Sequence, residues 1–311
     1  MKLNMSPAPH VHSSQSTRVL MMNVIIALLP CAAAGVWYFG WSALVLMLVS
    51  VASAVLAEAA WQKLTGRSVL VGDCSAAVTG LILALNLPPH APWWLAVVGS
   101  AFAVVIVKGL FGGLGDNFIN PAMAARAVLL ASWPRYMTAW VAPTGWQSHV
   151  DAVSAATPLV APSSYSPMQL FLGDIPGSIG EVCKLAILIG LAWLLITKVI
   201  SWRIPVVMTA SVFLFSLIFG RDPLASVLSG GVLFAAVFMA TDYVTCPMSA
   251  LGQIVFAALT GLLIVIIRRF GTYPEGVTYA ILLMNIATPL IDRCVKRRVY
   301  GHAKEANRQN G

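Results

Sequence analysis

The sequence predicts an all-α integral membrane protein with about ten transmembrane helices, arranged as two inverted repeats of five helices each. Its composition is the first reason, because 59% of the 311 residues are hydrophobic and only 10% are charged, whereas soluble domains carry about 25% charged residues. The second reason is a succession of apolar segments near the roughly 20 residues that a helix needs to span a bilayer. The third is a Gly-rich interruption at a matching place in each half of the chain.

Each apolar segment is predicted to form one helix, with five in residues 19–133 and five in residues 182–295. The first segment has no small-residue cleavage site, so we expect a retained helix rather than a signal peptide. The third and fifth are shorter than a full span and are expected to be tilted, broken or packed inside the bundle. The ten predicted helices are 19–39, 42–62, 74–87, 92–108, 120–133, 182–199, 204–219, 226–240, 250–267 and 277–295.

The distribution of Lys and Arg predicts the orientation of these helices. With the N-terminus in the cytoplasm, most basic residues fall on the cytoplasmic side, as the positive-inside rule requires. Both tails, residues 1–18 and 296–311, are then cytoplasmic, and residues 134–181 form a loop on the periplasmic side. The adjacent Arg268 and Arg269 are the exception, because they fall on the periplasmic side as well.

A basic residue, a Gly-rich break and an acidic residue precede the last predicted helix of each half. These are Lys108 and Asp116 in the first half, and Arg269 and Glu275 in the second. An odd number of helices per half gives equivalent halves opposite topology, and such inverted repeats commonly form a site near the bilayer midplane. The alternative is that the two Gly-rich loops are unrelated.

A run of small residues in the 134–181 loop contains the strongest candidate for chemistry. Residues 151–159 read Asp-Ala-Val-Ser-Ala-Ala-Thr-Pro-Leu, which resembles the signature at which a flavin transferase links FMN to a threonine through its phosphate. The hydroxyl of Thr157 can form this phosphoester, and the small Ala156 leaves the backbone accessible. Asp151 and Ser154 can position the loop by hydrogen bonding. The alternative is an ordinary Ser/Thr/Pro loop.

Arg126 is a second candidate, because it falls inside the fifth predicted helix. A charge within a membrane helix costs about 2.5–3.5 kcal/mol on insertion scales, so it must face protein, water or an anion. A flavin phosphate is one suitable anion. A structural ion pair, for example with Asp116, is the alternative.

Several other classes of function and site are disfavoured. The basic residues behind the net charge of +8 stand at the ends of apolar segments, which does not indicate nucleic-acid binding. The five cysteines show no C-x-x-C spacing, so we expect no complete iron–sulfur site and no metal site. Residues 112–115 are Gly-rich but lie between apolar helices, the wrong context for a dinucleotide fingerprint, and there is no P-loop.

Acidic residues near helix ends are candidates for an ion path, and two of them, Asp116 and Glu275, occupy the matching breaks. The full set is Glu58, Asp73, Asp116, Asp242 and Glu275.

Three stretches together carry a family resemblance. They are residues 112–123 (Gly-Gly-Leu-Gly-Asp-Asn-Phe-Ile-Asn-Pro-Ala-Met) followed by Arg126, residues 151–159, and residues 273–285 continuing to Asp292. In order and content they resemble the NqrB/RnfD family, which contributes membrane subunits to the Rnf ion-translocating oxidoreductase complex and to the sodium-pumping NADH:quinone oxidoreductase. The match is closer to the Rnf members, and it covers the whole chain.

The resemblance implies a membrane flavoprotein of the bacterial cell inner membrane, with both termini cytoplasmic and FMN on Thr157. It implies a subunit that is not catalytically complete alone, in a complex coupling electron transfer between ferredoxin and NAD(H) to Na+ or H+ translocation. The implied partners are a second periplasm-facing FMN subunit, iron–sulfur subunits, the lipid bilayer and a flavin transferase. A second, non-covalent flavin such as riboflavin is also implied. Ala155 departs from the glycine that the signature often has, but it is still small.

Two other functions are compatible with the helix pattern alone. One is a ten-helix solute channel or transporter without a redox role, and the other is a structural scaffold for redox subunits. The 151–159 signature separates the flavoprotein interpretation from both, since neither needs an acceptor site for a transferase.

Overall fold

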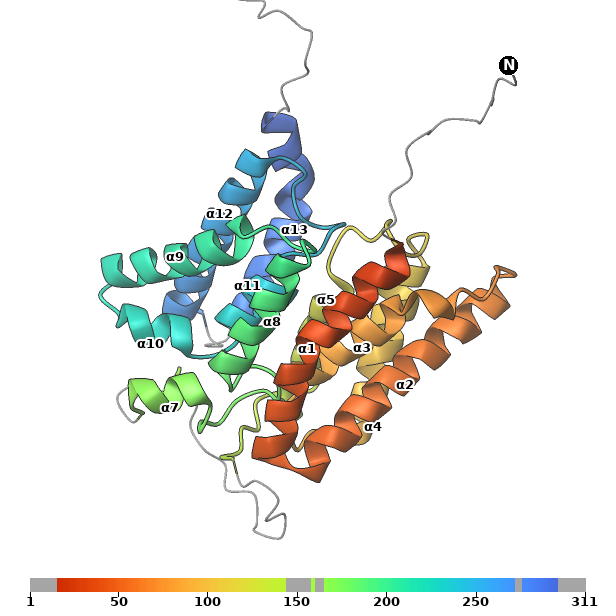
Figure 1. Cartoon of the computed structure of the whole chain (residues 1–311), viewed down its shortest axis with the longest axis horizontal. Helices are drawn as coiled ribbons and strands as arrows, with labels where there is room; N and C mark the ends of the chain where they lie inside the picture. Colours follow the sequence, from red (N-terminus) through yellow and green to blue (C-terminus); the bar gives the residue numbers. More distant parts are fainter. Residues whose placement is uncertain (1–15, 144–157, 160–164, 272–275, 296–311) are drawn as a thin grey trace, which may run out of the picture.

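The computed structural model describes residues 16–143, 158–159, 165–271 and 276–295, and its regular elements are helices (Figure 1). The first half contains α1 Thr17–Phe39, α2 Trp41–Leu64, α3 Ser75–Leu85, α4 Trp93–Ala101, the π-helical segment Phe102–Gly109 that continues α4, and α5 Pro121–Ser132. The short helices α6 Pro134–Met137 and α7 Pro167–Leu172 follow. The second half contains α8 Lys184–Ile196, α9 Arg203–Ile218, α10 Pro223–Leu228, α11 Val232–Phe238, α12 Ala250–Phe270 and α13 Val277–Cys294.

The lengths of these helices agree with a membrane protein that has both full and partial spans. Among the described residues, three helices are long and apolar enough to cross a bilayer, namely α1, α2 and α12. Five more apolar helices are shorter, and they include the continuous helix Trp93–Gly109. The all-α membrane class predicted from composition is therefore confirmed.

One predicted helix is wrong as a continuous element. Residues 226–240 were expected to form a single helix, but α10 and α11 are separate and Ser229–Gly231 lie between them. Gly230 has a φ of +65°, a conformation that glycine adopts without the steric penalty of a Cβ atom. The Gly-Gly pair interrupts the helix even though both flanks are apolar.

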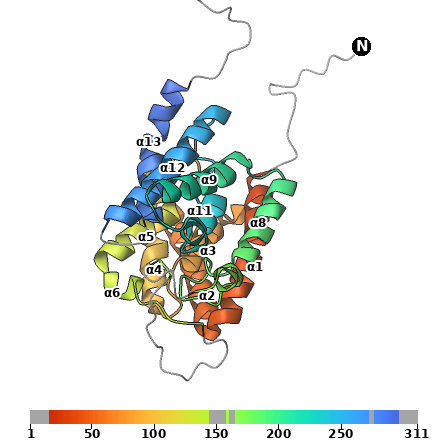
Figure 2. The ribbon, with the colours of Figure 1, turned by 90° about the vertical axis from the view of Figure 1, so that its left-hand side faces the viewer.

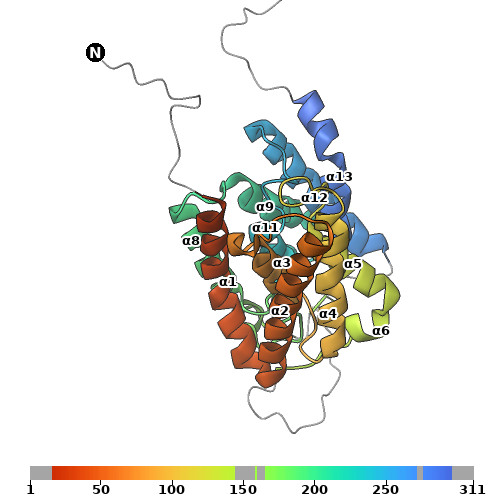
Figure 3. The ribbon, with the colours of Figure 1, turned by 90° about the vertical axis from the view of Figure 1, so that its right-hand side faces the viewer.

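Each half packs around its second helix, and the two halves meet along several helices. In the first half α2 packs against α3 and α4, and in the second half α9 packs against α10, α11 and α12. Between the halves, α1 packs against α8 and α5 against α13. Figures 2 and 3 show α8 beside α1. The two helices run in opposite directions, since α1 descends from the N-terminal end and α8 rises from the end near α7 (Figure 1).

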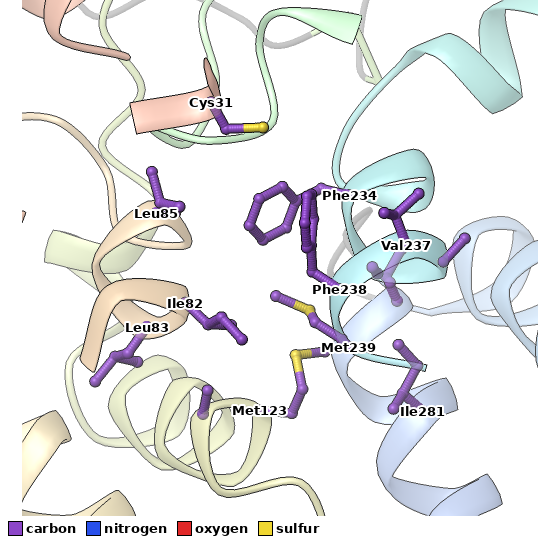
Figure 4. Close-up of a cluster of buried hydrophobic side chains, with 14 of the residues drawn as sticks. Cys31, Ile82, Leu83, Leu85, Met123, Phe234, Val237, Phe238, Met239 and Ile281 are labelled. Carbon is purple, nitrogen blue, oxygen red and sulfur yellow. The ribbon is translucent and has the colours of Figure 1, made fainter. Parts of the chain in front are cut away.

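The buried core is shared by both halves. Figure 4 shows side chains of α3 and α5 facing those of α11 and α13 across the centre of the molecule. The rings of Phe234 and Phe238 lie 5.1 Å apart between centroids. Close helix contacts surround this core: a methyl group at Gly190 would lie 2.4 Å from the Ala27 carbonyl oxygen, so only a glycine permits this approach of α8 to α1.

Candidate functional site

Residues 151–159, in which the sequence predicts flavin attachment (the predicted attachment segment), lie almost wholly outside the described residues. Asp151, Ser154, Ala156 and Thr157 are among the residues that are not described, so their predicted roles stay predictions. The two residues that follow, Pro158 and Leu159, are described, and Pro158 is buried. Their surroundings show which part of the bundle these two residues contact.

Leu159 packs against the break between α10 and α11. A methyl group placed on Gly230 would lie 2.9 Å from Leu159 Cδ1 and 3.1 Å from Arg268 Nη2. The side chain of Leu159 and the guanidinium of Arg268 therefore flank the same glycine. Thr157 is only two residues from Leu159, and two residues of extended chain span at most about 7 Å.

Arg268 is a buried arginine in the last turn of α12. Its Nη1 donates to the Ser226 carbonyl oxygen at 2.6 Å and its Nη2 to the Ser229 carbonyl oxygen at 3.1 Å. The Ser226 carbonyl lies in the last turn of α10 and the Ser229 carbonyl in the break. The last carbonyl groups of a helix have no intrahelical hydrogen-bond donor. Arg269, which the sequence pattern matched to Lys108, is exposed. In the sequence, Arg268 stands out only as an exception to the positive-inside rule, and that exception is the signal that could identify it.

Two further charged residues lie near Arg268. Lys184 begins α8, is fully buried, and donates a hydrogen bond to the Glu181 carbonyl oxygen. It interacts electrostatically with both Glu181 and Arg268. The Glu181 carboxylate accepts a hydrogen bond from the Ser178 amide at 3.0 Å. This group places two cations and one carboxylate in the part of the bundle next to Leu159.

Arg126 is buried within α5, as the sequence predicted for a charge that must avoid lipid. Its Nη1 donates to Asn86 Oδ1 at 2.7 Å, and Asn86 Nδ2 in turn donates to the Ile82 carbonyl oxygen at 2.6 Å. Arg126 is thus anchored to the C-terminal end of α3. This contact does not test the proposed pairing with a flavin phosphate, which stays a prediction.

At the other end of the molecule, four polar side chains form a connected cluster. Lys108 Nζ donates to Glu58 Oε1 at 2.5 Å and to Ser75 Oγ at 2.5 Å. Ser75 Oγ donates to the Asp73 carboxylate at 2.9 Å and 3.0 Å. Lys108 and Glu58 are both buried. The structure thus joins Glu58 and Asp73, two of the five acidic candidates for an ion path, through Lys108 and Ser75. Asp116 is exposed, and Glu275 lies outside the described residues.

Two cavities adjoin this cluster. One of about 270 Å³ lies between the halves, is mostly apolar, and includes Asn117, Asn120 and Asp242 among its lining residues. Asn120 caps α5 and its amide nitrogen donates to the Met239 carbonyl oxygen at 3.3 Å, so it links the two halves. Burial raises the pKa of Asp242, which follows α11 in a connecting segment, and hydrogen bonds from Thr245 and Asn117 oppose this shift.

The other cavity has a volume of about 790 Å³ and lies against the ends of α2 and the π-helical segment. Its lining includes Glu58, Trp61, Arg67, Asp73 and Lys108. Lys108 therefore lines both cavities.

Comparison with known proteins gives one consistent result. Residues 4–301 match the model of the NQR2, RnfD, RnfE family. The chain is 49% identical to the D subunit of the Na(+)-translocating ferredoxin:NAD(+) oxidoreductase complex of Acetobacterium woodii, over 98% of this chain and 97% of the relative. It is 40% identical to the D subunit of the ion-translocating oxidoreductase complex of Halorhodospira halophila, over 95% of each chain. It is also 40% identical to the D subunit of the proton-translocating ferredoxin:NAD(+) oxidoreductase complex of Clostridium ljungdahlii, over 95% of each chain.

Proposed function

This chain belongs to the NQR2, RnfD, RnfE family, and from this premise we propose that it is the RnfD subunit of an Rnf-type complex. In this role it is a membrane flavoprotein that carries electrons while the complex couples transfer between ferredoxin and NAD(H) to ion translocation. The observation that carries the proposal is the 49% identity to the relative from Acetobacterium woodii over nearly the whole of both chains. Relatives named for sodium and for proton translocation are both similar to this chain, so the proposed ion is Na+ or H+.

The cofactor proposed for this role is FMN on Thr157, attached through its phosphate. Support comes from the 151–159 sequence and from the surroundings of Leu159, because the side chains of Leu159 and Arg268 flank the same residue, Gly230. A phosphodiester is an anion, and charge-assisted hydrogen bonds from arginine to phosphate are among the strong ones. Arg126 is proposed as a second compensating charge. Asp151, Ser154 and Ala156 are proposed to shape the attachment loop.

The proposed partners follow from the same role. An electron carrier that is incomplete alone needs neighbours, which we propose are the other Rnf subunits, including a periplasm-facing FMN subunit and iron–sulfur subunits. A flavin transferase is proposed to attach the FMN. A second, non-covalent flavin such as riboflavin is also proposed. The cavity of about 270 Å³ suits its planar ring chemically, because it is mostly apolar with a few polar side chains.

We further propose that the fold is a pair of inverted five-helix repeats with about ten spans in the bacterial inner membrane. The packing supports this proposal, since the pairs α2–α4, α1–α3 and α4–α5 have counterparts in α9–α12, α8–α11 and α12–α13. The opposite directions of α1 and α8 also support it (Figure 1). The segments 1–18 and 296–311 are then cytoplasmic tails, and residues 134–181 face the periplasm between the halves 19–133 and 182–295.

A denaturing gel tests the cofactor directly. The purified chain, produced together with a flavin transferase, should fluoresce under ultraviolet light, and mass spectrometry should find an FMN adduct within residues 151–159. A chain without the transferase should be dark, because nothing in it activates a flavin precursor. Absence of the adduct from the wild-type chain would favour the solute transporter as the better function.

Reporter fusions test the orientation. A periplasmic reporter fused near Pro162 and a cytoplasmic reporter fused after Arg308 should both be active, because the Lys and Arg distribution places these positions on opposite sides. The opposite pair of results would reverse the topology and move the proposed flavin to the cytoplasmic side.

A further inference from the structure

The cluster around Lys108 forms a wall between the two cavities. Lys108 and Ser75 line the cavity of about 270 Å³, while Lys108, Glu58 and Asp73 line the cavity of about 790 Å³. The hydrogen bonds from Lys108 to Glu58 and Ser75, and from Ser75 to Asp73, hold this wall together. Ionisable residues inside a membrane protein are costly and mark ion pathways.

The two oxygens of the Glu58 carboxylate differ in their surroundings. Oε1 accepts from Lys108, whereas Oε2 is buried and has no hydrogen-bond partner among the described residues. Trp61 Nε1, one turn further along α2, is also buried and has no partner within the same part of the chain. Both side chains line the larger cavity. Because an unsatisfied buried oxygen is expensive, a species that approaches Glu58 Oε2 from this cavity would be stabilised there.

The charges at this cavity favour a small cation. Its inner wall offers the carboxylates of Glu58 and Asp73, and carboxylate oxygens are the ligands of hard cations. The cationic groups that line it are Lys108, which already bonds Glu58, and Arg67, which is exposed and donates to the Gly112 carbonyl oxygen at 2.7 Å. The ammonium of Lys108 therefore occupies the position that a cation from the cavity would take.

The backbone at Lys108 is π-helical, which is an uncommon conformation. Lys108 lies at the end of the π-helical segment Phe102–Gly109, and π-helical turns occur frequently at functional sites. The next residue, Gly109, packs under Trp61, since a methyl group there would lie 2.6 Å from Trp61 Nε1. The lysine thus lies in the last turn of an irregular helix and borders both cavities.

We propose that Glu58, to which Asp73 is linked through Ser75 and Lys108, forms an exchange site for a monovalent cation, with the Lys108 ammonium as its tethered occupant. A cation that enters from the larger cavity binds Glu58, and Lys108 turns toward the smaller cavity, which it already lines. Passage from one cavity to the other requires this ion pair to open, so Lys108 acts as a gate. The cation is Na+ or a proton, which share the carboxylate as ligand or acceptor. Only the coupling of this exchange to electron flow rests on the proposed function.

The test uses the assembled complex in sealed membrane vesicles and the double variant Glu58→Gln/Lys108→Met. Removing both charges together leaves no unpaired buried ion, so the chain should insert and carry its flavin. Uptake of 22Na+ per electron transferred, measured with a protonophore, or acidification per electron transferred, measured without Na+, should be lost. The matched control is Asp174→Asn/Lys63→Met, which removes two exposed charges and should leave ion uptake unchanged.

The outcomes separate the two proposals. Ion uptake at the wild-type level in the double variant would overturn the exchange site, and the Lys108–Glu58 pair would then be structural. Absence of flavin or of electron-driven ion uptake from the wild-type complex would instead overturn the proposed function. The arm that is lost in the double variant identifies the cation as Na+ or H+.

Discussion

The helices before the two Gly-rich breaks each carry a buried basic residue near their ends, and the two residues are held in different ways. Lys108, in the first half, pairs with the carboxylate of Glu58 and lies in the wall between two cavities. Arg268, in the second half, donates to the neutral backbone carbonyls of Ser226 and Ser229. Under the proposed topology these residues lie on opposite sides of the membrane.

The difference indicates which ion each end suits. The Glu58 carboxylate binds the ammonium of Lys108 and also lines a cavity. Under the proposal, a cation from this cavity can therefore displace the ammonium. A guanidinium beside Leu159 can attract the phosphate of the flavin proposed on Thr157. Under the proposed inverted repeat, one kind of helix ending would suit cation binding on one side of the membrane and anion binding on the other.

The largest expected effect is at the flavin end. Thr157→Ala should abolish covalent FMN, because the phosphoester needs a β-hydroxyl, and electron flow through the complex should stop. Thr157→Ser should retain part of the flavin, and Ser154→Ala should lose much less, since Ser154 only positions the loop. Gel fluorescence and mass spectrometry measure the flavin in each variant. A Thr157→Ala chain that remains fluorescent would contradict the attachment of FMN to Thr157, and with it the proposed contact of the flavin phosphate with Arg268.

The next effect is at the lysine end. Lys108→Met alone leaves the Glu58 carboxylate buried without its partner, which should lower the free energy of unfolding by about 3–5 kcal/mol. Lys63→Met is the matched control, because Lys63 is exposed on α2 and its loss should change stability by less than about 0.5 kcal/mol. Thermal unfolding in detergent, together with SDS titration, compares the two. Equal stability of both variants would show that the buried Lys108–Glu58 pair does not contribute to the free energy of unfolding.

A variant of Arg126 tests whether flavin retention depends on Arg268 alone or on both arginines. Arg126→Leu removes a charge-assisted hydrogen bond to Asn86, which costs about 1.5–3 kcal/mol, and it should weaken flavin retention while the chain still inserts. Arg135→Leu, at an exposed arginine just after α5, is the control. Normal flavin content and normal electron transfer in Arg126→Leu would refute the phosphate pairing. Failure to insert would favour a structural role.

The smallest effect tests the contact between Leu159 and the helix break. Gly230→Ala places a methyl group 2.9 Å from Leu159 Cδ1, and φ of +65° adds a strain of about 1–2 kcal/mol. Gly220→Ala has the same strain at φ of +69° but nothing within 4 Å. Both variants should lose similar stability from strain, yet only Gly230→Ala should lower the yield of covalent flavin. Equal flavin yields in the two variants would show that the contact between Leu159 and Gly230 does not affect flavin attachment.

Hydropathy predicted the helices well, because the free energy of burying apolar surface in lipid depends on local composition. The predicted ends agree with α1, α2, α12 and α13 to within three residues. The break in 226–240 was missed because both flanks are apolar, although Gly230 and Gly231 were visible in the sequence. Local hydropathy reports whether a segment is apolar, and it does not report whether its backbone continues.

The site was predictable only in part, because its key contacts join distant segments. Glu58 and Lys108 are 50 residues apart and meet only after α2 packs against the π-helical segment. The sequence pattern includes Glu58 among the acidic candidates but singles out Asp116, which is exposed, and Glu275, which lies outside the described residues. For the arginines it favoured Arg126 from its position in a helix, whereas the neighbour of Leu159 is Arg268.

The close packing of α8 on α1 has a consequence for biogenesis. Gly190 fits against Ala27, so the complementary surface of α1 is completed by a residue that is synthesised more than 150 positions later. At the roughly 5–20 residues per second of translation, α1 waits for about 8–30 seconds before its partner leaves the ribosome. During that interval the surface of α1 around Ala27 is open to lipid and to the insertion machinery. Mutations that enlarge Gly190 should therefore trap the nascent chain with its first half inserted and its second half undocked, a defect of assembly rather than of chemistry.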